Sequence, residues 1–278
     1  MNAPDIHDFD TLKAVVAAGR QREGTALDVR SRPVPYSYHD LCTNVWKAGN
    51  LLGHYGVHGI GELAVVVGPK TEETDGPLSS QTGRLDSAEA LLAIFGGAII
   101  GAAVDLTPVE PVDAPALVAP AHARIETAPG CSRLAYGGPP TDPAVSHFER
   151  ELWSENPIEP PETVTPDDDA LRVRDRIWTH EQLLSVAVDV VEEYSLDTRT
   201  RVVLESRITE PGGFVAGVLA PLAVGATVVV PGEDSTGSER LGDTANDART
   251  VVVSEKNGGD GYVDVDTVTR SMRDTDRV

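Results

Sequence analysis

Short apolar runs alternate with amphipathic segments through the second half of the chain, and this alternation constrains the fold more than any other feature. Apolar runs predict strands at 171–177, 201–205, 227–230 and 250–254. Segments with helical spacing of apolar residues lie between them and predict helices at 179–194, 211–223 and 238–248. Strands and helices that alternate in units this short are typical of an open sheet of mainly parallel strands. The sequence therefore predicts an α/β fold with open, mainly parallel sheets flanked by helices.

The first half contains the same kinds of element, separated by longer loops. Apolar runs predict strands at 25–31, 63–67 and 102–106, with shorter candidates near Leu117 and Leu134. Ser37 and Asp40 have the spacing of a capping box, in which side-chain oxygens satisfy the first amides of a helix. Other helix starts are expected at Asp8 or Asp10, at Asp86 and at Ala144. The polar stretch 70–84 is expected to be an exposed loop.

A proline-rich acidic segment at 156–166 is the best internal boundary in the chain. It predicts a first α/β subdomain at 1–155 and a second at 167–255, joined by this linker. The tail at 256–278 is charged, and we expect it to be frayed. The domain organisation predicted from the sequence is therefore two small α/β units and a loose C-terminal end.

Acidic residues outnumber basic ones by 44 to 23, which gives a net charge of −21, and only four of the basic residues are lysines. Dense carboxylates with few lysines suit a protein that stays soluble in concentrated salt, where screening removes most of the self-repulsion. The composition therefore predicts the cytoplasm of a halophile, with an ordinary acidic protein as the alternative. Because phosphate neutralisation needs clustered Lys and Arg, the charge also argues against nucleic acids and anionic membranes as partners.

Three further features predict a soluble, cytoplasmic protein. Cys42 and Cys131 are isolated thiols, which indicates neither a disulfide framework nor a zinc site. The first residues, 1–9, are acidic and polar, unlike a secretory signal. The longest apolar run, 90–104, is interrupted by glycines and is shorter than the ~20 residues of a membrane-spanning helix.

Three blocks of sequence resemble the adenylate-forming acyl-CoA synthetase superfamily, the AMP-binding enzymes. YSYHDLCTNVWKAGNLLGHYGVHGIGELAVVV at 36–67 is similar to a family helix that leads through a Gly-rich turn into a buried strand. SAEALLAIFGGAIIGAAVDLTP at 87–108 and GGFVAGVLAPLAVGATVVVPG at 212–232 are similar to two later blocks, in the family's order. The resemblance implies the first part of the family's large N-terminal domain, and all three blocks belong mostly to its scaffold.

The residues that carry the family's chemistry are replaced at 172–178. In the family, a strand like 169–171 runs into a loop of the form Thr-Ser-Gly-Thr-Thr-Gly-x-Pro-Lys-Gly, and a helix then begins with Thr-His-x-x-Leu. Glycine amides, hydroxyls and the lysine of such a loop hold phosphate. This chain keeps Thr179-His180 at the helix start, but RVRDRIW at 172–178 contains no Gly, Ser, Thr or Lys.

The remaining candidates for binding phosphate or nucleotide are grouped in this segment, at Arg172, Arg174, Arg176 and Thr179. Guanidinium groups pair bidentately with phosphate, which motivates the arginines. Asp175 lies among them, so the alternative is a solvated face of alternating charge on a short strand or hairpin. Either interpretation leaves the chain without the family's phosphate loop.

Other departures remove the rest of the expected active site. The family usually places an aromatic residue and a histidine, which line the acyl pocket, where this chain has RITE at 207–210. The later Tyr-Gly-x-Thr-Glu motif, the ribose-binding Asp and the small C-terminal domain with its catalytic Lys are not found in the sequence. His54 and His58 are four residues apart, but Gly56 between them favours a solvated helix end over a metal pair. The sequence predicts no catalytic residue and no metal ligand.

The sequence therefore predicts a truncated, degenerate relative of the acyl-CoA synthetases, a pseudoenzyme with a binding, regulatory or assembly role and no cofactor. One alternative is half of a split ligase that activates a carboxylic acid with ATP, in which case ATP, AMP or CoA would bind. Another is a module for a small ligand. Because an open sheet without its family partners leaves apolar surface exposed, the expected partner is a second copy or a complete acyl-CoA synthetase.

Overall fold

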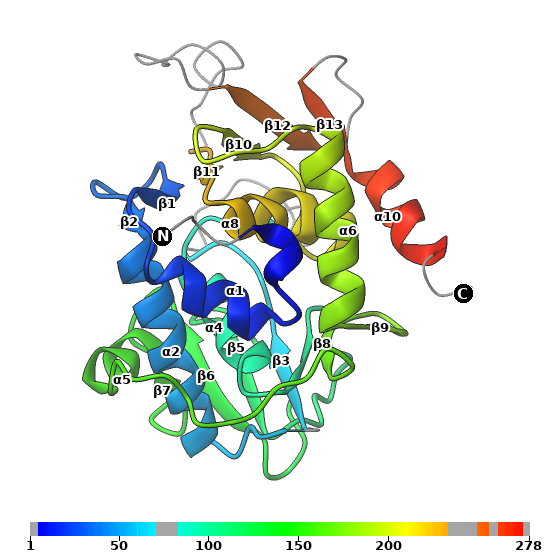
Figure 1. The fold of residues 1–278 in the computed structure, drawn as a ribbon. Coiled ribbons are helices and arrows are strands. Elements are labelled where there is room, and N and C mark those ends of the chain that lie inside the picture. The colour runs from blue at the N-terminus through cyan, green and yellow to red at the C-terminus, as the bar shows by residue number, and fades with distance from the viewer. Residues whose placement is uncertain (1–4, 60, 71–82, 233–248, 256–260, 275–278) are drawn as a thin grey trace.

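The structure is a computed structural model, and it describes residues 5–59, 61–70, 83–232, 249–255 and 261–274. This part of the chain forms two sheets with a layer of helices between them, and Figure 1 shows one sheet above the helices and the other below. The predicted α/β fold with open, mainly parallel sheets is confirmed. The expected helix at 238–248 and most of the expected loop at 70–84 lie outside the described residues.

The first sheet joins strands from both ends of the sequence, in the order β13-β12-β10-β11-β1-β2. Its strands are β1 Thr25–Val29, β2 Tyr36–Ser37, β10 Arg201–Leu204, β11 Thr227–Val230, β12 Thr250–Ser254 and β13 Tyr262–Asp264. Neighbouring strands are parallel except β1 and β2. The valine-rich runs suit this position, because parallel strands are buried on both faces.

The second sheet has the order β7-β6-β5-β3-β4-β8-β9. Its strands are β3 Glu62–Val65, β4 Ala103–Asp105, β5 Ala116–Pro120, β6 Ser132–Tyr136, β7 Ser146–His147, β8 Asp169–Val173 and β9 Arg176–Thr179. All neighbours are parallel except β8 and β9, which form an antiparallel pair. The chain passes from β3 to β4 on one side and then returns to β5 on the other side of β3.

The helices between the sheets share one continuous hydrophobic core with the inner face of each sheet. The helices are η1 Ile6–Asp8, α1 Leu12–Gly19, α2 Tyr38–His54, α4 Glu89–Ala98, α5 Phe148–Ser154, α6 His180–Glu193, α7 Pro211–Phe214, the π-helical turn η2 Val215–Leu219, α8 Ala220–Val224 and α10 Val265–Asp274. Figure 1 places α1, α4, α6 and α8 in this middle layer. The predicted single helix at 211–223 is thus α7, η2 and α8 in succession.

One of the predicted helix caps is confirmed and two are wrong. Ser37 accepts a hydrogen bond from the Asp40 amide at 3.0 Å and begins α2 as predicted. The N-cap of α1 is Thr11 rather than Asp8 or Asp10. Helix α4 begins at Glu89 without a side-chain cap, because the Asp86 carboxylate instead accepts from the Lys70 amide at 2.7 Å.

Helices α2 and α4 approach closely because both carry glycine at the contact. A Cβ atom at Gly96 would lie 2.7 Å from the Ala48 Cβ atom and 3.0 Å from the Gly49 nitrogen. A Cβ atom at Gly49 would lie 2.9 Å from Pro160 Cγ. These contacts are too short for any side chain, so the two glycines set the spacing between α2, α4 and the segment that contains Pro160.

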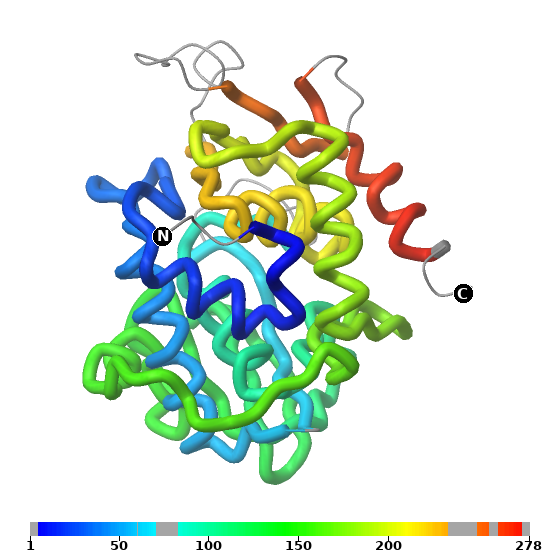
Figure 2. The backbone as a smooth tube through the Cα atoms, in the orientation of Figure 1, coloured from blue at the N-terminus to red at the C-terminus, as the bar shows by residue number. Residues whose placement is uncertain are grey.

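The predicted linker at 156–166 is fixed to the helical layer, and Figure 2 shows it crossing the molecule from α5 to β8. Lys13 of α1 donates to the Pro160 carbonyl oxygen at 2.8 Å, and also to that of Glu162. Each sheet takes strands from both sides of this segment. The sheets therefore do not coincide with the predicted subdomains 1–155 and 167–255, whose status as separate folding units stays a prediction.

The tail differs from the frayed end predicted for 256–278. Residues 262–274 form β13 and α10, and α10 packs on α7 and α6. Val265, Val268 and Met272 are buried at helical spacing. The charged residues between them conceal this short apolar stripe in the sequence, which explains why the helix was not predicted.

Candidate functional site

The segment where the sequence resemblance expects a phosphate loop is a tight hairpin rather than the predicted single strand at 171–177. Strands β8 and β9 pair with Leu171 opposite Trp178 and Val173 opposite Arg176. Arg174 and Asp175 form the turn, and Arg174 has a φ of 58°, in the left-handed region. Non-glycine residues seldom adopt this conformation, so the turn lacks the Gly or Asn signal by which a hairpin is recognised in a sequence.

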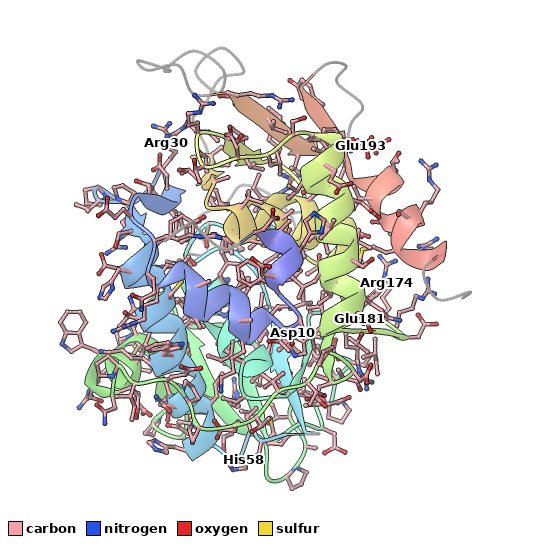
Figure 3. All side chains as sticks on the ribbon, viewed as in Figure 1. Asp10, Arg30, His58, Arg174, Glu181 and Glu193 are labelled. Atoms are coloured by element: carbon pink, nitrogen blue, oxygen red, sulfur yellow. The ribbon has the colours of Figure 1, made fainter. Side chains whose placement is uncertain are left out.

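Arg174 is held at the tip of the hairpin by two contacts. Its backbone amide donates to the Thr107 hydroxyl, in the loop that follows β4. Its guanidinium Nη2 lies 3.2 Å from Glu210 Oε1, just before α7. Figure 3 labels Arg174 on the same side of the view as Glu181, which lies at the start of α6. The charge of Arg174 is therefore engaged by a carboxylate of the chain itself.

The other two arginines have different partners. Arg172 forms an ion pair with Glu62 of β3. The guanidinium carbon of Arg176 lies 6.0 Å from the centre of the Trp178 ring, on the same strand. Because each guanidinium contacts a different group, the structure does not direct the three arginines toward one shared point. Phosphate binding by these residues stays a prediction.

Thr179, the fourth predicted residue, is the N-cap of α6. Its hydroxyl accepts from the Gln182 amide at 3.3 Å, and the Gln182 side chain accepts from the Thr179 amide at 3.0 Å. This reciprocal pair is a capping box, and it begins the helix predicted at 179–194. The hydroxyl that the resemblance offers for nucleotide binding is thus used to start the helix.

His180 lies beside this cap and is fully buried. Its Nδ1 accepts from the backbone amide of Leu12 at 3.1 Å, so it satisfies an amide in the first turn of α1. Burial lowers the pKa of His180 to about 4, although the nearby carboxylates of Asp168 and Asp10 act in the opposite direction. His180 therefore ties the N-terminal helix to the junction between β9 and α6 as a neutral acceptor.

The second segment that departs from the family pattern, 206–213, is closed against the first. Ile208 is fully buried, and its amide donates to the Gly83 carbonyl oxygen at 2.8 Å. Glu210 carries the ion pair with Arg174. The replacement for the phosphate loop and the replacement for the acyl-pocket residues therefore contact each other directly. Sequence reasoning identified both segments but missed this pairing, because they are far apart along the chain.

Solved structures of similar fold identify the architecture. An anthranilate CoA ligase, AuaEII, in complex with anthranoyl-AMP, matches with a TM-score of 0.66 at 15% identity, over 90% of this chain and 51% of its own. The N-terminal subdomain of NpsA from Klebsiella oxytoca matches with a TM-score of 0.66 at 12% identity, over 91% of this chain and 61% of its own. The N-terminal domain of FACL13 from Mycobacterium tuberculosis matches with a TM-score of 0.61 at 14% identity, over 80% of this chain and 57% of its own.

The chain has the N-terminal fold of adenylate-forming enzymes. No protein-family model and no curated protein matches the sequence. At these identities the likeness establishes the fold alone, and the chain spans less than two thirds of each of these structures. The adenylate-forming fold confirms the expectation drawn from the three scaffold blocks at 36–67, 87–108 and 212–232.

The described part of the chain offers neither a metal centre nor a membrane-spanning helix. Residues 5–59, 61–70, 83–232, 249–255 and 261–274 contain no group of three or more His, Cys, Asp or Glu side chains placed to hold a metal ion. Within the same ranges, every helix is too short or too polar to cross a lipid bilayer. The junction of β8, β9 and α6 is therefore the candidate site on which a functional proposal has to rest.

Proposed function

We propose that this chain is a non-catalytic member of the adenylate-forming fold, with a binding, regulatory or assembly role. The observation that carries the proposal is the ion pair between Arg174 and Glu210. It joins the two segments that, in the resembling enzymes, would hold phosphate and line the acyl pocket. A carboxylate at this point repels phosphate and neutralises the arginine that would attract it.

The junction also lacks the donors that adenylation requires. A phosphate loop presents several free amides and hydroxyls to its ligand. Here the Thr179 hydroxyl caps α6, and the Arg174 amide is bonded to Thr107. Opening the site would break the hairpin contacts and the Arg174–Glu210 pair together. The proposed role requires no cofactor. It is carried out in the cytoplasm.

A second candidate function is half of a split acid–thiol ligase, which would use ATP and CoA only when joined to another chain. In this alternative the second chain would supply the phosphate-binding groups that the junction of β8, β9 and α6 uses for its own contacts. Under the non-catalytic proposal the partner is a second copy of this chain or a complete acyl-CoA synthetase, whereas the split ligase needs a chain that carries the missing catalytic residues. Neither proposal involves nucleic acid or a membrane.

Pyrophosphate exchange into ATP, measured with a panel of carboxylic acids, separates the two functions. We expect no exchange by the purified chain, alone or with the product of the neighbouring reading frame, in molar KCl. Exchange by the chain alone would refute the non-catalytic proposal. Exchange that appears only with a second chain would establish the split ligase.

Matched variants decide whether the junction is responsible for any exchange that is seen. Arg172→Gln and Arg176→Gln would abolish exchange if the arginines hold phosphate. The control is Arg199→Gln, because the Arg199 side chain is 77% accessible and lies far along the chain from the hairpin. A complete acyl-CoA synthetase assayed in the same salt shows that the conditions permit the reaction.

A further inference from the structure

A large cavity lies at the carboxyl end of the second sheet, away from the junction of β8 and β9. Its volume is about 1060 Å³, and none of the residues that line it belongs to 172–179. It is lined by Lys70, by 119–126 around the end of β5, and by 137–142 after β6. Pockets that bind small molecules are typically ~300–1,000 Å³, so this cavity has the size of a ligand site.

The position of the cavity follows from the order of the strands. The chain moves from β3 to β4 on one side and then to β5 on the other, so β3 and β5 flank a point where the direction of winding reverses. In open parallel sheets, ligands bind outside the carboxyl ends of the strands at such a point. Lys70 follows β3 and His122 follows β5, and both line the cavity.

The absence of crossover helices leaves the space open. The described connections from β4 to β5, from β5 to β6 and from β6 to β7 contain no helix, at 106–115, 121–131 and 137–145. Parallel strands are usually joined by a helix that covers one face of the sheet. Small side chains, including Ala119 and Ala135, line the exposed side instead. The floor of the cavity therefore includes small apolar side chains, of which Ala119 is 7% and Ala135 5% exposed.

The cavity is lined by three basic side chains and three acidic ones, Lys70, Arg124 and Arg133 against Glu110, Glu126 and Asp142. Its attraction for an anion therefore depends on the basic groups that no carboxylate neutralises. Arg124 is exposed, lines the cavity, and makes no ion pair or hydrogen bond with the described residues. Arg133 also lines it, and its Nη1 lies 4.0 Å from Asp142 Oδ2, a loose contact. The carboxylate of Glu110 at the rim accepts from the Glu126 amide at 2.8 Å. Two weakly engaged guanidinium groups beside one cavity are notable in a chain with a net charge of −21.

His122 provides a further unpaired polar group. Its Nδ1 atom is buried, and no hydrogen-bond partner for it lies among the described residues. Buried polar atoms in folded proteins are nearly always paired with a protein group or with ordered water, so this atom is available to a bound molecule or to water. Lys70 is less available, since its Nζ lies 2.9 Å from Glu89 Oε2.

We propose that this cavity binds a small organic anion, a carboxylate or phosphate joined to an apolar body. Arg124 and Arg133 would pair with the anionic group, and the floor around Ala119 and Ala135 would contact the apolar body. The site is independent of the proposed function, because an active ligase would carry the same cavity. A failure here leaves the pyrophosphate-exchange result unaffected.

Isothermal titration calorimetry at constant ionic strength tests the site with benzoate, phenyl phosphate and inorganic phosphate. We expect benzoate or phenyl phosphate to bind with millimolar affinity or better, and the stronger of the two identifies the anionic group. We expect inorganic phosphate to bind at least about tenfold more weakly, since it lacks the apolar body. Absence of binding by both organic probes would overturn the proposal, and so would equal binding of inorganic phosphate.

Charge variants locate the binding. The double variant Arg124→Gln and Arg133→Gln should weaken the better probe by at least about tenfold, the loss expected when charge-assisted hydrogen bonds are removed. Arg199→Gln, which removes the same kind of charge from an exposed residue outside the cavity, should change the affinity by less than about twofold. Equal weakening in all variants, or none in the double variant, would refute the assignment. Thermal melts of each variant confirm that the fold is retained.

Discussion

The buried histidine at the start of α6 gives a quantitative prediction about stability and pH. His180 accepts a hydrogen bond from Leu12 as a neutral ring, so protonation removes the acceptor and places a charge in the core. Its pKa is lowered from 6.5 to about 4 by burial, against the opposing effect of Asp168 and Asp10. Replacement by glutamine, His180→Gln, removes the titrating ring and keeps a neutral polar side chain.

The magnitude follows from the two pKa values. Because the folded pKa lies below the unfolded one, the unfolded chain binds more protons between about pH 6.5 and pH 4, and stability falls as the pH is lowered through this window. The values differ by about 2.5 pH units, and each unit corresponds to about 1.36 kcal/mol, which gives about 3 kcal/mol in total. At pH 4.5 the free energy of unfolding should be lower than at pH 7 by ~2–3 kcal/mol, somewhat less than the full amount.

The assay is urea unfolding of the native chain and of His180→Gln, in molar KCl, between pH 7 and pH 4.5. We expect the native chain to lose ~2–3 kcal/mol more than the variant over this range. The matched control is His58→Gln, which replaces an exposed histidine and should follow the native curve. Parallel curves for the native chain and His180→Gln would refute the role of His180 as a neutral buried anchor.

Three further perturbations test the packing and the charge. Lys13→Met should lower the free energy of unfolding by ~2 kcal/mol in urea titrations, because it removes charged hydrogen bonds to the linker carbonyls, including Pro160; an unchanged midpoint would show that the linker needs no such attachment. Gly96→Ala should cost ~1–3 kcal/mol by the same measurement, since its Cβ would lie 2.7 Å from the Ala48 Cβ atom. Gly53→Ala on α2, where the nearest atom is 3.9 Å away, should instead be neutral or stabilising by up to ~1 kcal/mol. Molar KCl should raise the melting temperature, as the prediction of a halophilic protein requires, and indifference to KCl would contradict that prediction.

The sequence predicts those parts of the fold that depend on neighbouring residues. Ser37 and Thr179 begin their helices because a hydroxyl three residues before an amide is a local device. The pairing of β1 with β11, which sets Leu27 opposite Val228, depends on contacts between distant segments, and no local pattern encodes it. The same limit explains why the predicted division into subdomains does not follow the sheets.

In the candidate site, too, features set by neighbouring residues could be predicted from the sequence, and contacts between distant segments could not. The missing glycines and lysine at 172–178 are visible in the sequence, and they were sufficient to identify the segment. The sequence left a strand and a hairpin both open at this segment, because Arg174 adopts a left-handed conformation that usually belongs to glycine or asparagine. The contacts of His180 with Leu12 and of Arg174 with Glu210 join distant segments, so they required the structure.

The most direct test of the account is whether MgATP reaches the junction of β8, β9 and α6. Nuclear magnetic resonance of the ¹⁵N-labelled chain reports the backbone amides of Arg174 and Arg176 and the arginine Nε groups separately. We predict that millimolar MgATP leaves these signals unmoved, because the Arg174 guanidinium is already paired with Glu210 and the hairpin presents no loop of free amides to phosphate. A saturable shift of the Arg172, Arg174 and Arg176 signals would contradict the account and would establish a nucleotide site at the hairpin.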